Sequence, residues 1–556
     1  MLPLLVWSSL VLGLGAGTIA WLGRNPFPDG YQNEYIHVGN AFDLFDALAR
    51  WDTWHLRYYV AHAYWPPLFY AATWPLQAVW ERSRDALVLT NMAWLALALA
   101  CTYRLSRGRT AGVAAMLLLA LSPGLFGTLV RYEPNIAQLG CLGLALLGVQ
   151  RSRGFRSLGW SLLAGLGLAG GLLTDRLGTA PFLALPLLLA LLPAPAPAAP
   201  SQRVRIPPDA GAALPDAPKW RPPWKGVLLF GLVVLVLAAP WYTQWLGTQL
   251  QEVSSQLAAG EIDSAGDLTE RPAQLGPRWL YYPLVLLDSQ AGPVLGAWML
   301  LALGVGLVRG LRKRQGLLRR PGIDGLLLAC VLSGWLAFTV IQKKQVFYTL
   351  PLLLPLAVLG GRLVGRCGFA RLPLLLLLLA AGLHQYGWRL WDHGSPSLQA
   401  LGQPDPIPLS WVYPRHTMAR APSDLLLPMD AWTEAIGDCE GKVVVFSDHH
   451  AYYEGFINLA LRQAYPRCDI HGLRGDPNGT YEWFRVAQAF LVIGSEPAGR
   501  WPSQATMEAA LDADHYTLED LPPVVEMILQ HSHAWQIEAQ WALDQGGSAT
   551  LWKRKP

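Results

Sequence analysis

The residues best suited to chemistry lie just after the first apolar segment, between Asp29 and Pro67. Two carboxylates, Asp29 and Glu34, follow a stretch long enough to cross a bilayer, and the chain then runs through Trp, His and Tyr residues to Tyr64-Trp65-Pro66-Pro67-Leu68. A passive membrane anchor needs none of these groups. Acidic side chains at the rim of a transmembrane bundle mark an ion path or a reaction site.

Further charged and aromatic side chains stand at the ends of other apolar segments. They are Arg131-Tyr132-Glu133, Asp175-Arg176 and Gln342-Lys343-Lys344-Gln345-Val346-Phe347-Tyr348. Taken singly, such residues snorkel to the interface or cap a helix end. Taken together they indicate an anionic ligand, because loops on the outer side of a membrane normally avoid Arg and Lys. The natural ligand is a lipid phosphate held by charge-assisted hydrogen bonds.

The elements that must position these residues are membrane helices. The chain is 52% hydrophobic and only 15% charged, and many of its apolar runs reach the ~20 residues that a helix needs to cross hydrocarbon. Its 25 Trp residues suit two interfacial belts. The net charge of +4 does not indicate nucleic acid, because the basic residues follow the membrane. We expect a multi-pass α-helical protein of a bacterial inner membrane.

Hydropathy and the placement of Arg and Lys predict eleven spans, with the N-terminus inside and the C-terminus outside. The spans are expected near 4–22, 86–104, 110–128, 134–150, 157–174, 178–193, 226–245, 285–308, 323–341, 346–364 and 372–388. The connections expected in the cytoplasm hold 20 Lys or Arg residues against two Asp: 104–109, 151–156, 194–225, 309–320 and 362–371.

One apolar segment does not fit as a span. A crossing by residues 66–81 would place Arg104, Arg107 and Arg109 outside, so we expect 66–81 to lie in the outer interface. The first apolar segment is expected to be retained as a span, because it lacks the basic flank of a signal peptide.

The composition predicts two domains. Residues 1–390 form the membrane domain, with a periplasmic loop at 23–85 and a Pro-rich cytoplasmic linker at 194–225. Residues 391–556 have the composition of a water-soluble domain, expected in the periplasm. Strands are expected at 443–446, 489–493 and 549–552 with a helix at 451–464, a pattern typical of an α/β domain. No Gly-rich phosphate fingerprint follows these strands, so we expect a lid or an acceptor-recognition domain without a nucleotide site.

The sequence leaves open whether two of the six cysteines form a disulfide. Cys439 and Cys468 each precede a predicted strand, and in an oxidising periplasm they either form a disulfide or remain buried thiols. Cys101, Cys141, Cys330 and Cys367 are expected to be packing residues. The chain has no CxxC and no His/Cys metal spacing.

These motifs resemble those of the GT-C superfamily, the polyprenyl-phosphate-sugar-dependent glycosyltransferases. The nearest resemblance is to bacterial relatives of protein O-mannosyltransferases and lipid A aminoarabinose transferases, over roughly residues 1–390. The matching segments are Asp29…Glu34-Tyr35, Tyr64-Trp65-Pro66-Pro67-Leu68, Arg131-Tyr132-Glu133-Pro134, Asp175-Arg176-Leu177-Gly178 and Lys344-Gln345-Val346-Phe347-Tyr348-Thr349-Leu350-Pro351. Two features depart from the family pattern. The usual adjacent Asp-Glu is split into Asp29 and Glu34, and the Lys after the fifth span is replaced by Arg176 with an acid beside it.

The resemblance implies transfer of a sugar from a polyprenyl-phosphate donor to an acceptor outside the cytoplasm, with inversion at the anomeric carbon. Asp29 is the expected base, with Glu34 as its partner or as an acceptor-orienting group. The residues expected to bind the donor phosphate are Arg131, Arg176, Lys344 and Tyr348. Further substrate contacts are expected from Tyr35, Tyr64, Glu133, Asp175 and Lys343, and Glu133 is also a candidate ligand for a divalent cation.

Two alternatives belong to other classes of protein. A transporter or flippase of lipid-linked sugars would place ionisable groups near the bilayer midplane and often show internal repeats. In this chain the spans are apolar through their middles and the charges cluster at one face. An O-antigen ligase or polymerase would use the same donor type, but its large loop would come late in the chain and not after the first span.

Overall fold

The computed structural model describes the helical part of the chain almost completely and the C-terminal part in pieces. The described residues are 2–23, 32–53, 56, 65–80, 83–176, 178–191, 223–258, 278–312, 323–340, 347–390, 429–437, 442–447, 461, 469–472, 487–494, 534–542 and 548–554. The chain divides into two units. The first comprises 1–21, 44–75 and 87–419, and the second comprises 22–43, 76–86 and 420–556.

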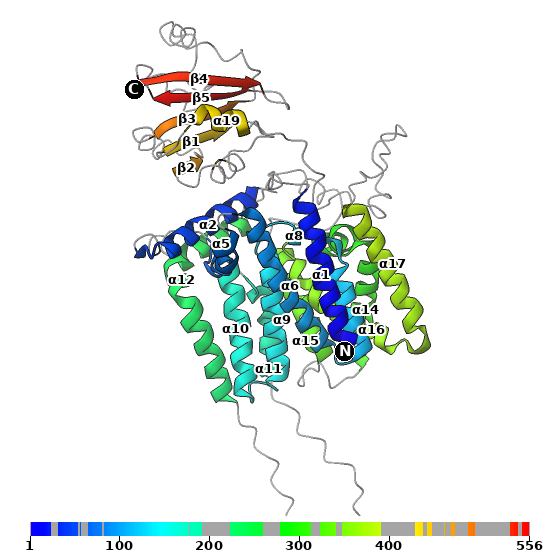
Figure 1. Ribbon diagram of the computed structural model, residues 1–556. Helices are drawn as coiled ribbons and strands as arrows, with labels where there is room; N and C mark the ends of the chain where they lie inside the picture. The colour runs from blue at the N-terminus through cyan, green and yellow to red at the C-terminus, as the bar shows by residue number, and fades with distance from the viewer. Residues whose placement is uncertain are drawn as a thin grey trace, which may run out of the picture. The chain divides into compact units, whose positions relative to one another are not determined.

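The first unit is a bundle of helices (Figure 1). Its elements are α1 Leu2–Leu22, α4 Leu68–Ala71, most of α6 Arg84–Ser106, α7 Arg109–Ala120, α8 Pro123–Leu129, α9 Asn135–Arg151, α10 Leu158–Thr174, α11 Ala180–Leu191, α12 Trp224–Ala258, η1 Arg278–Leu280, α13 Tyr281–Val285, η2 Leu286–Gln290, α14 Gly292–Arg312, α15 Ile323–Val340, η3 Leu350–Leu352, α16 Leu353–Arg366, η4 Gly368–Ala370 and α17 Arg371–Leu390. Three helices, α2 Gln32–Ala49, α5 Trp74–Trp80 and α6, have residues in both units.

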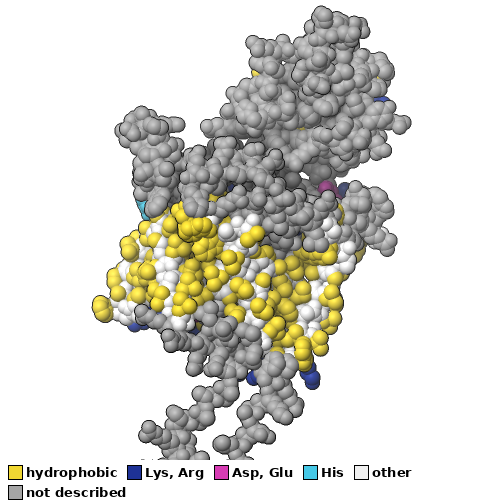
Figure 2. Space-filling view, turned by 180° about the vertical axis from the view of Figure 1, so that it is seen from behind, with side chains coloured by type: hydrophobic (Ala, Val, Ile, Leu, Met, Phe, Trp, Pro, Cys, Tyr) yellow, Lys and Arg dark blue, Asp and Glu magenta, His cyan; other side chains and the backbone are white. Residues whose placement is uncertain are grey.

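Five helices of the described part are long and apolar enough to cross a membrane, or six if the bent pair α7–α8 is one span. The five are Leu2–Leu22, Arg84–Ser106, Trp224–Thr243, Gly292–Leu311 and Ile323–Val340. On the face seen in Figure 2, hydrophobic side chains form a band, with Lys and Arg side chains at its lower rim. Each of the eleven segments expected to span contains helix, and the number eleven itself stays a prediction.

Three of the expected spans are not the continuous helices that hydropathy suggested. The helix expected at 110–128 is bent by 60° between α7 and α8, because Pro123 lacks the N–H that would continue the helical ladder. The span expected at 285–308 begins with the π-helical turn η2, after which Gly292 has a φ of 75°. The segment at 346–364 opens with a turn and the 3₁₀ helix η3 before α16 begins.

Close packing of α9 against α10 depends on two glycines. A Cβ atom on Gly148 would lie 2.5 Å from the backbone nitrogen of Ala164, and one on Gly167 would lie 2.4 Å from that of Ala145. Small residues let membrane helices approach until their backbones touch, which is where their dispersion attraction is largest. This pair is the scaffold of the candidate site, because the site residues lie at the start of α9 and the end of α10.

The second unit contains a five-stranded sheet with the order β2-β1-β3-β5-β4. Its strands are β1 Lys442–Ser447, β2 Asp469–Gly472, β3 Ala487–Gly494, β4 Trp535–Ala542 and β5 Ser548–Arg554, and the short helix α19 Met429–Ile436 precedes them. β1 pairs in parallel with β2 and β3, whereas β5 runs antiparallel to β3 and β4.

The three strands expected from sequence are present as β1, β3 and β5. The helix expected at 451–464 lies outside the described residues except for Leu461, which is helical and buried. Cys439 and Cys468 also lie outside the described residues, so the disulfide stays a prediction. The parallel register pairs Lys442, which follows Cys439 in the chain, with Asp469, which follows Cys468. Cys101, Cys141 and Cys330 are buried free thiols, and Cys367 is partly buried.

Candidate functional site

The candidate residues of the first unit lie where helices join. Arg131, Tyr132 and Glu133 connect α8 to α9, Asp175 and Arg176 connect α10 to α11, and Tyr348 stands just before η3. Such joints are the places in a membrane bundle where irregular backbone can carry function without leaving its polar groups in lipid.

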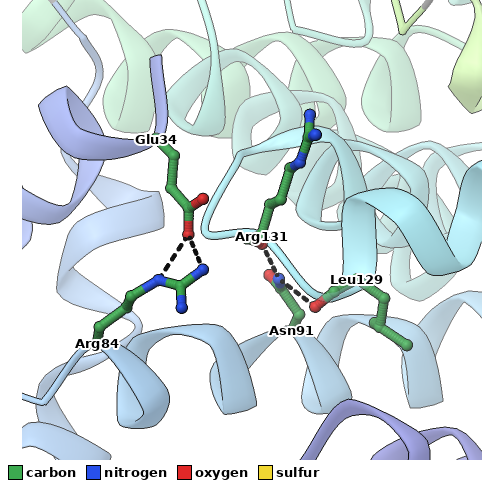
Figure 3. A network of polar contacts seen from close by, with 5 residues as sticks. All are labelled: Glu34, Arg84, Asn91, Leu129 and Arg131. Atoms are coloured by element: carbon green, nitrogen blue, oxygen red, sulfur yellow. Dashed lines mark hydrogen bonds and ion pairs between the residues drawn. The ribbon is translucent and has the colours of Figure 1, made fainter. Parts of the chain in front are cut away.

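Arg131 is held through its main chain. Its carbonyl accepts a hydrogen bond of 2.7 Å from the Nδ2 of Asn91, which also donates to the carbonyl of Leu129 at 3.3 Å. The guanidinium extends away from Asn91 (Figure 3), and only 4% of the residue is exposed. A cation so far removed from water attracts a nearby anion more strongly than a solvated one does, because the local dielectric constant is low.

The rest of this joint is fixed by aromatic and polar contacts. The ring of Tyr132 stacks on Phe69 with centroids 4.4 Å apart, and its hydroxyl donates to the carbonyl of Phe69 at 3.2 Å. Glu133 is 2% exposed, and its Oε2 accepts a 3.1 Å hydrogen bond from Asn135. The segment that contains Trp65 and Phe69 therefore packs directly against the start of α9.

Asp175 ends α10 and links it to α9. Its Oδ1 accepts a hydrogen bond of 2.7 Å from the backbone N–H of Arg176, and Gln138 in the first turns of α9 donates to its Oδ2. Since Gln138 lies only a few residues after Glu133, the two charged joints share one end of the α9–α10 pair. The clustering of charge that sequence suggested is present for these segments.

Arg176 is held on two sides. Its guanidinium carbon lies 4.0 Å above the centre of the Trp65 ring, and its carbonyl accepts a hydrogen bond from the hydroxyl of Tyr242 in α12. An Arg over an aromatic face gains ~0.5–2 kcal/mol and keeps its N–H groups at the edge of the stack for other acceptors. This arrangement holds the Arg176 side chain and main chain in place.

Tyr348 lies in an aromatic group beside a buried polar tether. Its ring is 5.3 Å from that of Phe338 and 5.6 Å from that of Phe347. The next residue, Thr349, accepts a 3.0 Å hydrogen bond from Gln290, and both partners are at least 98% buried. Gln290 is the last residue of the π-helical turn η2, and such turns frequently occur at functional sites.

Glu34 belongs to the second unit and forms a buried ion pair there. Its Oε1 lies 3.1 Å from the Nε and 3.0 Å from the Nη2 of Arg84. Glu34 is 0% exposed and Arg84 is 1% exposed. In the same unit, Gln77 of α5 donates to the carbonyl of Ala41 at 3.3 Å. These contacts join α2, α5 and the first turn of α6.

The other candidates from sequence are not placed. Asp29, Tyr64, Lys343 and Lys344 lie outside the described residues, and so does the side chain of Tyr35 in α2. Among the described residues no three His, Cys, Asp or Glu side chains gather at one point. The binding of a divalent cation by Glu133 therefore stays a prediction.

Sequence reasoning missed the residues that hold the candidates in place. Asn91, Gln138 and Gln290 each carry a side-chain amide inside or at the edge of a segment expected to span the membrane. A buried amide costs free energy unless its hydrogen bonds are made, so its presence in an apolar run was the available signal. Trp65 was quoted within a motif, but its stacking on Arg176 could not be foreseen without the fold.

Comparison with known proteins gives a result for structure alone. No family model and no curated protein matches the chain. The crystal structure of ArnT from Cupriavidus metallidurans bound to undecaprenyl phosphate covers 99% of this chain and 97% of its own, with a TM-score of 0.54 and 12% identity. The apo form of the same protein covers 98% and 97%, with a TM-score of 0.52 and 12% identity. The chain has a GT-C fold.

The GT-C fold confirms the architecture implied by the sequence motifs, that of a multi-pass membrane protein. At 12% identity the likeness concerns the fold and not the chemistry. Any function for this chain must therefore be argued from its own residues.

Proposed function

We propose that this protein is an inverting membrane glycosyltransferase. It moves a sugar from a polyprenyl-phosphate donor to a hydroxyl-bearing acceptor (a lipid, a polysaccharide or a protein) outside the cytoplasm of a bacterium. The observation that carries the proposal is the gathering of Arg131 and Arg176, two ordered cations, at one end of the α9–α10 pair. A second support is the GT-C fold, whose member ArnT has been crystallised with undecaprenyl phosphate.

The donor phosphate is the group that these cations suit. As the bond between the anomeric carbon and the phosphate oxygen breaks, negative charge grows on that oxygen. Arg131 and Arg176, with Lys344 and Tyr348, stabilise it by charge-assisted hydrogen bonds in a site from which water is largely excluded. Tyr35, Tyr64, Glu133, Asp175 and Lys343 contact the substrates, with Asp175 also holding the turn that presents Arg176.

The acceptor needs a base. In our proposal Asp29 takes the proton of the acceptor hydroxyl while the oxygen attacks the anomeric carbon, and the polyprenyl phosphate leaves from the opposite side. Glu34 acts as the partner of Asp29. Its Oε1 is engaged by Arg84, so we assign proton transfer to Asp29 and a supporting place to Glu34.

The test compares wild type with Asp29→Asn, which keeps the size of the side chain and removes the proton acceptor. We expect wild type in nanodiscs to transfer sugar from an undecaprenyl-phosphate donor. We expect mass spectrometry of glycolipids and glycans to identify the product as the species that a deletion strain lacks. We expect Asp29→Asn to bind undecaprenyl phosphate normally and to transfer ~10²–10⁴-fold more slowly.

Two outcomes would contradict these assignments. Normal turnover by Asp29→Asn would remove the base from Asp29. Movement of intact lipid-linked sugar across proteoliposomes, without cleavage of its phosphate bond, would make the protein a transporter and overturn the proposed function.

A further inference from the structure

Asn91 is a buried amide within an apolar helix. It lies in α6, one of the helices that can cross a membrane, and it is 0% exposed. Transferring an amide from water into such surroundings is unfavourable unless hydrogen bonds replace those to water. Its Nδ2 makes two, to the carbonyls of Leu129 at 3.3 Å and Arg131 at 2.7 Å.

Both carbonyls belong to the turn by which the chain leaves α8. The last carbonyls of a helix have no partner within it and need one from elsewhere. α8 ends at Leu129 and α9 begins at Asn135, so one side chain of α6 holds the backbone at the start of the α8–α9 joint. Figure 3 shows the amide of Asn91 facing these two carbonyls.

The side chain of Arg131 leaves the backbone away from Asn91 (Figure 3). The guanidinium lies at the far end of the side chain from the hydrogen bonds that Asn91 makes. Rotation of the peptide at residue 131 would therefore move the guanidinium. We propose that Asn91 is a positioning residue that fixes the main chain of Arg131, and so presents the guanidinium to the donor phosphate. This inference rests on the proposed function and adds a residue that does not itself touch the lipid.

A matched control lies on the same helix. Thr102 is also 0% exposed, and its hydroxyl donates to the carbonyl of Ala98 one turn earlier at 2.8 Å. Thr102→Val removes one buried hydrogen bond from α6 and leaves the α8–α9 joint alone. If Asn91 served only the stability of α6, Asn91→Ala and Thr102→Val would have the same kind of effect.

The experiment measures the affinity of the full chain in nanodiscs for undecaprenyl phosphate, by native mass spectrometry. The variants are Asn91→Ala, Arg131→Ala, the double variant and Thr102→Val. We expect Asn91→Ala to weaken binding about five- to tenfold, as for one or two lost hydrogen bonds. Thr102→Val should bind as wild type does. The double variant should bind no more weakly than Arg131→Ala, because Asn91 acts through Arg131.

Asn91→Asp supplies a second readout. A protonated carboxyl can donate one hydrogen bond to the carbonyl of Arg131, whereas an ionised one repels it. The affinity of Asn91→Asp should therefore recover toward that of wild type as the pH is lowered. Asn91→Ala, which can donate at no pH, should keep a constant ratio to wild type.

The possible failures are distinguishable. If wild type does not bind undecaprenyl phosphate, the proposed function fails and this inference fails with it. If wild type binds, the inference alone is overturned by wild-type affinity in Asn91→Ala, by a further loss when Asn91→Ala is added to Arg131→Ala, or by an Asn91→Asp variant that binds as weakly as Asn91→Ala at every pH.

Discussion

Arg176 is a residue whose position is fixed from two sides. The Trp65 ring fixes the plane of the guanidinium, and the hydrogen bond from Tyr242 fixes the main chain behind it. A Lys at this position would carry the same charge without the flat group that stacks. The choice of Arg, where the family pattern has Lys, is thus matched by an aromatic partner in this chain.

We predict that Arg176→Ala and Lys344→Ala each weaken the binding of undecaprenyl phosphate, because phosphate charge is left uncompensated where the dielectric constant is low. Arg176→Lys should recover only part of the loss, since it restores charge but not stacking. Affinity for the lipid measures both effects, with the exposed Arg50, at 70% side-chain exposure, replaced by Ala as control. If both Ala variants bind and transfer normally, these cations are interfacial anchors only.

We predict that removing the charge of Glu34 from the buried pair of Glu34 and Arg84 destabilises the protein. Glu34→Gln leaves the Arg84 guanidinium buried without its counter-charge, which costs about 3–5 kcal/mol. Thermal unfolding of the purified protein should show a lowered Tm for this variant. Glu34→Gln combined with Arg84→Met should recover most of the loss, because no charge then stays buried. An unchanged Tm in Glu34→Gln would mean that the pair contributes no stability.

At the scale of elements, the approach of α9 to α10 decides the geometry of the site. Gly148 and Gly167 allow it, and the hydrogen bond from Gln138 to Asp175 lies at the end where the charged joints meet. Helix separation is therefore coupled to the distance between Arg131 and Arg176.

We predict that Gly167→Leu separates these helices and impairs the site. Its Cβ would meet the backbone of Ala145, which cannot move aside as a flexible side chain would. Transfer should fall and the Tm should drop by several degrees, whereas Gly159→Leu, with nothing near its Cβ, should leave both unchanged. Equal behaviour of the two variants would show that close approach is not needed.

Some elements could be predicted from sequence and others could not, for physical reasons. Helices at the expected spans follow from hydropathy, and β1, β3 and β5 contain short segments rich in apolar residues, which are typical of buried strands. β2 was missed because Asp469–Gly472 contains one large apolar residue, and β4 because its apolar residues alternate with Gln and Glu and form no continuous apolar run. Pro123 was a local signal for the bend that hydropathy does not read, whereas the turn η2 depends on packing, which composition does not report. Of the site, the charged residues were predictable and the amides that hold them were not.

At the scale of the whole molecule, the sidedness of the site depends on how 66–81 lies. The structure places two short helices there, α4 with 4 residues and α5 with 7, both below the ~20 that a crossing needs. In our topology both lie on the periplasmic side, and so do the charged joints.

We predict that a cysteine at Val79 reacts with an impermeant maleimide from the periplasm. Val79 is 71% exposed, whereas its neighbour Gln77 is fully buried and would label poorly from either side. A cysteine at Leu311, which is 70% exposed and lies within the expected cytoplasmic connection 309–320, should react only after permeabilisation. Replacing Cys367, Cys439 and Cys468 by Ser removes the native thiols other than the three buried ones. Labelling of the cysteine at position 79 only from the cytoplasm would mean that 66–81 crosses the membrane. The orientation of every later span would then be the reverse of the one predicted.

The ion pair of Glu34 with Arg84 also has a consequence for biogenesis. The two residues are 50 positions apart in the chain, which at ~5–20 residues per second separates their synthesis by about 3–10 s. During that interval the nascent Glu34 has no Arg84 to pair with. The carboxylate must wait in water or with a chaperone until α6 is delivered by the insertion machinery. We therefore expect α2 to take its final place only after α6 has been made, and a chain truncated before residue 84 to be a substrate for membrane proteases.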